Sequence, residues 1–148
     1  MSVVAWDGKT LAADKLGLYG CVTSATTKLF YSNNGGAVAF VGTLENGLAL
    51  VDWYMRGANK DEWPDSQKDD NNWSVLIVAE PGVAVHFYER LPFPQKVEDR
   101  FCAWGSGKEF AIGAMAMGAD AKTAVEVAIA HCDSCGIGVT SIEVNQNE

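Results

Sequence analysis

The 148-residue chain is short of basic charge. It carries 11 Lys and Arg residues against 19 Asp and Glu residues, which gives a formal net charge of −8. A surface with this balance repels the phosphate backbone of nucleic acids and the headgroups of anionic lipids. We therefore expect neither a nucleic-acid partner nor a membrane partner.

Long apolar runs, prolines and cysteines are also scarce. The longest apolar stretches, at residues 37–41 and 75–79, are strand-sized and far shorter than the ~20 residues of a membrane-spanning helix. Only four prolines, together with 48% apolar residues, exclude a disordered or collagen-like chain. Four cysteines are too few for a disulfide scaffold of this length and fit a reducing compartment.

The length and the first residues narrow the class further. A chain of 148 residues fits one domain on a prior of roughly 100–200 residues per domain, so we expect a single domain over residues 1–148. Residues 1–5 carry no basic region and are followed at once by Asp7. We therefore expect neither a signal peptide nor a transit peptide, and we expect a cytoplasmic protein.

The first half of the chain is rich in predicted strands. Short β-forming runs flank Asp7-Gly8, which is a strong hairpin signal. Strands are predicted at residues 2–6, 10–13, 19–23, 28–32 and 37–42. Thr43 then has the character of a helix N-cap, and apolar residues recur at helical spacing from Leu44 to about Gly57.

The second half of the chain contains two of the three predicted helices. Residues 59–72 are polar and are predicted to form a loop or a short irregular helix. Ser106 and Glu109 have the spacing of a capping box, which predicts a helix from Ser106 to about Gly118. Asp120 is predicted to cap the next helix. The remaining predictions are a hairpin at 73–80 and 83–89, strands at 100–104 and 139–144, and a helix at 121–132.

Strands and helices occur in runs and do not alternate, which is typical of an α+β fold and not of a parallel βαβ succession. The many apolar strand positions favour two packed, mainly antiparallel sheets. Helices before and after the later strands can cover both outer faces. We therefore predict a four-layer αββα sandwich.

Several sequence blocks occur in an order known from one family. They are Ser2-Val3-Val4-Ala5, Leu11-Ala12-Ala13-Asp14, Thr27-Lys28-Leu29, Ala39-Phe40-Val41-Gly42-Thr43, Gly105-Ser106-Gly107 and the helix that ends near Asp133. In this order the chain resembles the proteasome β-type branch of the N-terminal nucleophile hydrolases, which includes the bacterial HslV-like peptidases and has the αββα fold. The resemblance spans roughly residues 2–144.

The resemblance implies a catalytic site that needs neither a cofactor nor a metal. The residues that it implies are Ser2 as the nucleophile, Lys28, Asp14, the backbone N–H of Gly42 at the oxyanion, Ser106 as a hydrogen-bonding support, and Asp133. An N-terminal hydroxyl residue supplies its own base, because a free α-amino group has a pKa near ~8 and can accept the hydroxyl proton. This chemistry requires that Met1 be removed.

Three departures from the family pattern bear on this prediction. When Val4-Ala5 is laid on the family's first strand, the nucleophile position falls on Met1. A shift of one residue turns a side chain to the opposite face of a strand, so Ser2 can serve only if the shortened hairpin shifts the ladder. In addition, residues 59–72 stand where the family has a second long helix, and one strand replaces its C-terminal hairpin.

Each of these residues also has a structural interpretation. Asp14 and Lys28 can form a buried ion pair without catalysis. Ser106 can simply cap a helix, and Gly42 can mark a tight turn.

The pair Cys132-x-x-Cys135 beside His131 suggests another function, that of a redox or metal-binding protein. The sequence disfavours it, because a structural zinc site needs further ligands. Moreover, the pair closes a predicted helix, whereas a thioredoxin-like motif opens one.

Two functions remain for comparison with the structure. The first is an amide or peptide hydrolase that acts on a peptide substrate through Ser2. The alternative is a catalytically inactive, self-assembling scaffold subunit. In either case the resemblance, and a Trp-bearing first helix, lead us to expect a ring or helical homo-oligomer. The sequence identifies neither an ATPase partner nor a substrate preference.

Overall fold

The structure is a computed structural model that describes residues 2–145. Its strands are β1 (Val3–Trp6), β2 (Thr10–Asp14), β3 (Leu16–Tyr19), β4 (Val22–Ala25), β5 (Leu29–Tyr31), β6 (Ala37–Gly42), β7 (Ser74–Ala79), β8 (His86–Tyr88), β9 (Gln95–Lys96), β10 (Cys102–Gly105) and β11 (Val139–Glu143). Its helices are α1 (Leu44–Met55), α2 (Lys108–Ala116) and α3 (Ala121–His131), with short 3-10 turns η1 (Lys60–Glu62) and η2 (Asp65–Lys68). Within residues 2–145, no helix has the length and apolar character needed to cross a membrane.

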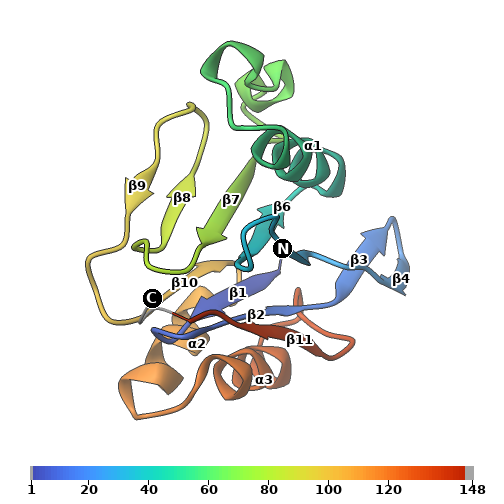
Figure 1. The fold of residues 1–148 in the computed structure, drawn as a ribbon. Helices are drawn as coiled ribbons and strands as arrows, with labels where there is room; N and C mark the ends of the chain where they lie inside the picture. Colours follow the sequence, from blue (N-terminus) through green and yellow to red (C-terminus); the bar gives the residue numbers. More distant parts are fainter. Residues whose placement is uncertain (1, 146–148) are drawn as a thin grey trace.

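The strands form two larger sheets and one small one. The first sheet has the order β10-β1-β2-β11, and the second has the order β5-β6-β7-β8-β9. Every pairing between neighbours is antiparallel. The third sheet is the hairpin β3–β4, which projects beside the two larger sheets (Figure 1).

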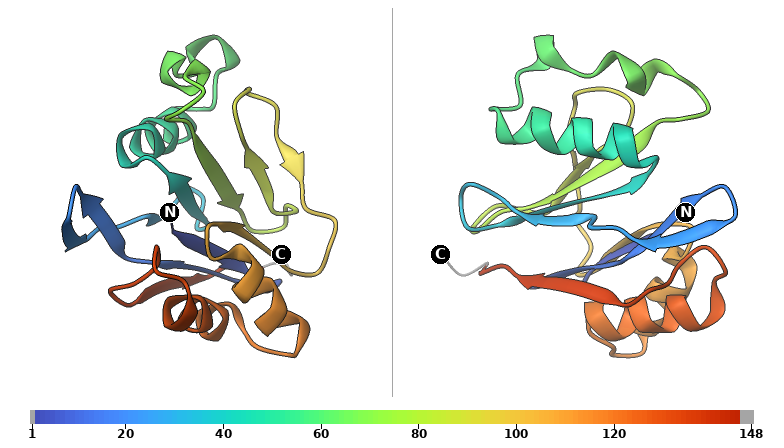
Figure 2. Two further views of the ribbon diagram at one scale, coloured as in Figure 1. Left: turned by 180° about the vertical axis from the view of Figure 1, so that it is seen from behind. Right: turned by 90° about the vertical axis from the view of Figure 1, so that its right-hand side faces the viewer.

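The two larger sheets pack face to face, with helices on both outer faces. Side chains alternate along a strand, so Val4 and Trp6 of β1 enter the core between the sheets,. Val3 and Ala5 of the same strand pack instead against α2 and α3. The layers α1, sheet, sheet and the α2–α3 pair are visible edge-on in the right-hand view of Figure 2. The predicted αββα sandwich is confirmed.

Helix α1 covers the outer face of the second sheet. Leu50 and Trp53 of the helix pack on Phe40 of β6, and Gly47 lies so close to the Phe40 ring that a side chain there would overlap it. Trp53 is 5% exposed and meets the ring of Trp63 edge-on, with centroids 4.7 Å apart. Trp53 is therefore covered by its own chain and is a core residue rather than a subunit contact.

Several predicted elements are confirmed with small shifts. The Asp7 turn forms as predicted, because its carboxylate accepts the N–H groups of Lys9 and Thr10 at 2.9 and 2.8 Å. Asp120 caps α3 by accepting the N–H of Thr123 at 2.8 Å. The polar segment 59–72 consists of η1, η2 and connecting loops, in line with the prediction of a loop or short irregular helix.

Other predictions were wrong. The strand predicted at 19–23 is instead divided between the end of β3, a turn at residues 20–21 and the start of β4, since Gly20 adopts a φ of +62°. The short strand β9 was not predicted. Ser106 does not cap α2: the N-cap is Gly107, and no side chain caps this helix. The Ser106 hydroxyl donates to the backbone carbonyl of Ser2 instead, at 3.3 Å.

Candidate active site

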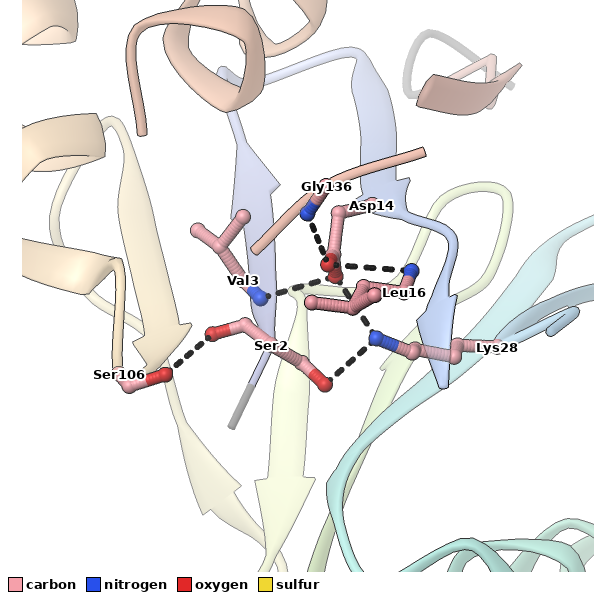
Figure 3. Close-up of polar contacts among 7 residues, drawn as sticks. All are labelled: Ser2, Val3, Asp14, Leu16, Lys28, Ser106 and Gly136. Atoms are coloured by element: carbon pink, nitrogen blue, oxygen red, sulfur yellow. Dashed lines mark hydrogen bonds and ion pairs between the residues drawn. The ribbon is translucent and has the colours of Figure 1, made fainter. Parts of the chain in front are cut away.

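Ser2, Lys28 and Asp14 form one buried cluster (Figure 3). The Lys28 ammonium donates a hydrogen bond to the Ser2 hydroxyl oxygen at 2.7 Å and another to Asp14 Oδ1 at 2.9 Å. The three residues are 3%, 4% and 0% exposed, respectively. The structure thus brings these three predicted site residues together, with Lys28 in contact with both Ser2 and Asp14.

Strand parity explains why Ser2 reaches Lys28. Ser2 lies two residues before Val4 and four before Trp6, both of which face the core between the sheets. Side chains two residues apart share a face, so the Ser2 hydroxyl also points toward the second sheet. Lys28 stands just before β5 of that sheet. The one-residue shift from the family's register therefore does not prevent the Ser2 side chain from reaching Lys28.

Asp14 is surrounded by donors. Besides the Lys28 ammonium, its carboxylate accepts the backbone N–H groups of Val3 at 3.1 Å, Gly136 at 3.1 Å and Leu16 at 3.4 Å. All four partners donate, so the carboxyl group acts only as an acceptor, as an ionised carboxylate does. The Lys28 head group is therefore held next to a carboxylate that is itself fixed by three backbone N–H groups.

The backbone of Ser2 is fixed from the opposite side. Its carbonyl oxygen accepts the hydroxyl of Ser106 at 3.3 Å and the backbone N–H of Gly107 at 3.2 Å. Gly105 passes so close to this carbonyl that a side chain there would overlap it. Ser106 thus contacts the Ser2 main chain and not its hydroxyl.

A cavity of about 140 Å³ opens beside the cluster. Its lining residues are Ser2, Leu16, Gly17, Leu18, Tyr19, Thr26, Lys28, Phe40, Gly42, Thr43, Leu44 and Ser134. Apolar side chains of β3 and β6 thus lie next to the polar cluster. This combination of an apolar hollow and a few convergent polar groups is typical of ligand sites.

Gly42 lies in this lining where β6 turns into α1. Its φ is +107°, and a Cβ atom there would lie 2.8 Å from the Cα atom of Ser74. Ser74 in turn donates its hydroxyl to the carbonyl of Thr43 at 2.8 Å. The turn therefore requires glycine and is tied to the neighbouring strand β7.

Asp133 is not brought to the cluster. Asp133 is exposed and is not among the described residues that line the cavity. Its carboxylate accepts a hydrogen bond from the Ser134 hydroxyl at 3.2 Å. The neighbouring Ser134 lines the cavity instead. Sequence reasoning missed Ser134, Gly107 and Gly136. The last two contribute only backbone N–H groups, for which a sequence carries no side-chain signal.

Comparison with known proteins supports the fold. No protein-family model and no curated protein sequence matches the chain. Among solved structures, the chain is similar to Thiobacillus denitrificans BPH in complex with epoxomicin, at 20% identity and a TM-score of 0.76 over 100% of both chains. BPH without that compound matches at 20% identity and a TM-score of 0.74 over 99% of both chains.

A third similar structure is eukaryotic HslV from Trypanosoma brucei, at 18% identity and a TM-score of 0.72, covering 98% of this chain and 99% of that one. These likenesses extend over almost the whole chain. The chain therefore has an HslV-like fold, which is the fold that the sequence resemblance implied.

Proposed function

We propose that this chain is an amide or peptide hydrolase in which the hydroxyl of Ser2 attacks the scissile carbonyl. The observation that carries the proposal is the 2.7 Å hydrogen bond from the buried Lys28 ammonium to the Ser2 hydroxyl. A lone serine hydroxyl is a weak nucleophile and needs a base and a nearby positive charge. Lys28 supplies the charge, and the carboxylate of Asp14 keeps it in place at 2.9 Å.

The base in this proposal is the α-amino group of Ser2 itself. Lys28 donates to the hydroxyl oxygen, so the hydroxyl proton is left free for transfer. A free α-amino group has a pKa near ~8 and can accept that proton at neutral pH. Neither histidine lines the cavity in the described part of the chain. The proposal therefore requires that Ser2 be the first residue of the mature chain.

The backbone of Ser2 supports removal of Met1. Ser2 has a φ of +116°, a conformation that L residues other than glycine rarely adopt and that stores on the order of 1–3 kcal/mol of strain. The angle φ is defined by the carbonyl carbon of the preceding residue. Removal of Met1 therefore relieves this strain and frees the α-amine in the same step.

The proposed reaction has two halves, acylation of Ser2 and hydrolysis of the resulting ester. The Ser2 oxygen forms a bond to the substrate carbonyl carbon while its proton passes to the α-amine. The N–H of Gly42 stabilises the oxyanion, and the leaving amine takes the proton as the C–N bond breaks. A water molecule attacks the resulting ester, gives a proton to the α-amine and releases the acid as the Ser2 hydroxyl is restored. Lys28 stabilises the negative charge on the Ser2 oxygen in both halves.

One experiment combines intact-mass measurement of the purified chain with turnover of a fluorogenic peptide. We expect a mass without Met1 and slow hydrolysis. Ser2→Ala keeps a small second residue, so removal of Met1 continues while the hydroxyl is lost, and activity is abolished. Ser141→Ala, on the exposed side of β11, is the matched serine control and keeps full activity. Hydrolysis that survives Ser2→Ala contradicts the proposal.

A second readout uses epoxomicin, the compound bound in one of the BPH structures. If the site acts as proposed, epoxomicin inhibits hydrolysis and its binding is lost in Ser2→Ala. Binding that is equal in Ser2→Ala and Ser141→Ala contradicts the assignment of this site.

The alternative is a catalytically inactive, self-assembling scaffold in the cytoplasm. The β3–β4 hairpin favours self-association, because Leu18, Tyr19 and Val22 are 40%, 57% and 63% exposed there. Native mass spectrometry at micromolar concentration tests this, and a monomer contradicts assembly under either function. A homo-oligomer that retains Met1 and hydrolyses nothing supports the scaffold.

A further inference from the structure

Cys132 and Cys135 form a close pair near the Ser2 site, since the Cys135 sulfur packs on Gly107. Helix α3 ends at His131, and the N–H of Cys135 bonds to the carbonyl of Cys132 at 3.4 Å. A hydrogen-bonded turn of this kind brings its first and last Cα atoms within about 7 Å. Disulfides join residues whose Cα atoms are about 4.4–6.8 Å apart, so the turn is compatible with a bond between these two thiols.

The two thiols differ in environment. Cys132 is partly accessible, and a hydrogen bond from the backbone N–H of Ser134, assisted by the side chains of Cys135 and Ser106, lowers its pKa. Cys135 is 6% exposed, and burial, followed by the negative charge of Asp14, raises its pKa to about 12. A partly accessible cysteine beside a buried one is the arrangement of an attacking and a resolving cysteine,.

The cysteine pair is connected to the Ser2 site through Gly136, which follows Cys135, and through Gly107, on which Cys135 packs. Gly136 donates its N–H to Asp14 at 3.1 Å, and its carbonyl accepts the N–H of Lys15 at 3.0 Å. The Cys135 sulfur lies against Gly107, where a Cβ atom would be 2.9 Å from it. Gly107 in turn holds the carbonyl of Ser2.

We propose that Cys132 and Cys135 are a peroxide-sensitive thiol pair whose oxidation to a disulfide shifts the loop that holds Asp14. The reaction and the loop shift stand on the geometry of the turn alone. Only the consequence for hydrolysis rests on the proposed function. Neither thiol takes part in the hydrolytic steps described above.

The chemistry balances with a hydroperoxide as the oxidant. The Cys132 thiolate attacks one oxygen of hydrogen peroxide and the O–O bond breaks. The other oxygen leaves as hydroxide and takes a proton from solvent to become water. Cys132 is then a sulfenic acid. The Cys135 sulfur attacks the Cys132 sulfur, and hydroxide leaves with the Cys135 proton as a second water. The two thiols together lose two electrons to the peroxide.

Formation of this bond has a structural consequence. A disulfide holds its sulfur atoms about 2.05 Å apart, so one or both cysteines move when the bond forms, and the proposed shift is that of Cys135. Its sulfur then leaves its packed position against Gly107, and the adjoining Gly136 N–H is drawn away from Asp14. Oxidation therefore weakens the support of Asp14 and changes the packing on Gly107, whose N–H holds the Ser2 carbonyl.

The positions of Lys and Arg make the oxidation easy to localise. Cleavage after these residues gives one peptide, 123–148, that contains both Cys132 and Cys135, while Cys21 falls in 16–28 and Cys102 in 101–108. After treatment of the full chain with hydrogen peroxide and alkylation of free thiols, peptide 123–148 is expected to lose two hydrogen atoms and take up no alkylating agent. A peptide 123–148 that still takes up two alkyl groups after peroxide treatment overturns the proposal.

The link to the site is tested by amide hydrogen exchange, which needs no activity. The Gly136 amide is expected to exchange faster after oxidation and to return on reduction by dithiothreitol. Cys135→Ser prevents the disulfide and leaves exchange at Gly136 unchanged by peroxide, whereas the control Cys102→Ser responds as the parent chain does. A disulfide that forms without faster exchange at Gly136 overturns the proposed loop shift.

Hydrolysis is a separate arm of the experiment. Peroxide is expected to lower turnover in the parent chain and in Cys102→Ser but not in Cys135→Ser. A chain that never hydrolyses peptides contradicts the proposed function while the mass and exchange results still decide the thiol pair. A chain that hydrolyses peptides equally well with and without the disulfide overturns the coupling alone.

Discussion

Lys28 and Asp14 join the two sheets of the sandwich through a buried ion pair, with the ammonium nitrogen 2.9 Å from the carboxylate oxygen. Asp14 ends β2 in the first sheet, and Lys28 stands just before β5 in the second. Burying two charges carries a desolvation penalty that often equals their attraction, so such a pair is weak evidence for a stabilising role. Its contact with the Ser2 hydroxyl gives a second reason for its presence.

The two roles of this pair are separated by three variants. Lys28→Met leaves the buried carboxylate of Asp14 without its ammonium, and we expect a loss of about 3–5 kcal/mol in the free energy of unfolding. The double variant Asp14→Asn/Lys28→Met removes both charges and should recover much of that stability. Chemical denaturation measures the stability of each chain, with Asp14→Asn as the third corner of the cycle.

Turnover of the same variants decides the role. If the pair serves catalysis, the double variant regains stability but stays inactive. A double variant that is stable and also active would show that the pair is structural only.

Gly42 is expected to tolerate no side chain. Gly42→Ala combines a φ of +107° with a Cβ atom 2.8 Å from the Cα atom of Ser74. The backbone strain alone is worth about 1–3 kcal/mol, and the contact with β7 adds to it. Gly57→Ala is the matched control, since Gly57 has a φ of +111° but nothing within 4 Å of an added Cβ atom. Thermal unfolding should therefore show a larger loss for Gly42→Ala, and equal losses would contradict the close contact.

Ser106 gives a prediction that distinguishes the two interpretations of this residue. In the structure its hydroxyl holds the Ser2 carbonyl at 3.3 Å and caps no helix. Ser106→Ala should therefore lower kcat with little change in stability, about 0.5–1.5 kcal/mol for one hydrogen bond. The Gly107 N–H still holds the same carbonyl. Circular dichroism that reports loss of α2 would instead support the capping role.

The predictable parts of the fold are those in which a side chain fixes the backbone locally. Asp7 and Asp120 are of this kind, because each carboxylate accepts nearby N–H groups and defines a turn or a helix start. The split of the predicted strand 19–23 into a turn at Gly20 was missed, since glycine in a short apolar run also fits a continuous strand. Strand β9 has only two residues, which is too short for a periodic pattern.

The site was predictable in its side chains and not in its backbone. The resemblance located Ser2, Asp14 and Lys28, and strand parity then explains their contact across the sheets. The donors Gly107 and Gly136 escaped notice because every residue except proline carries the same N–H group. Ser106 satisfied a capping pattern by spacing alone, yet its hydroxyl is used in a contact with a residue 104 positions away.

The stability of the protein should fall in two steps at alkaline pH. Burial raises the pKa of Cys135 from 9.0 to about 12, and burial, followed by the charge of Glu80, raises that of Tyr54 from 10.0 to about 12. In both cases the folded state binds its proton more tightly than the unfolded state does. The stabilisation is therefore complete below the ordinary pKa and is lost as pH rises through the window up to about 12.

Because the two windows begin at different pH values, single variants separate them. Cys135→Ala should reduce the decline that starts near pH 9, to which Cys102 also contributes because burial raises its pKa. Tyr54→Phe should reduce the decline that starts near pH 10, to which Tyr88 also contributes because burial raises its pKa. Urea denaturation of the parent chain and both variants between pH 8 and pH 11, with dithiothreitol present to keep the thiols reduced, measures the slopes as estimates of proton release. Each variant must be compared with its own stability at pH 8, since both substitutions also change packing. A slope that Cys135→Ala leaves unchanged would mean that the buried thiol is not a source of alkaline instability.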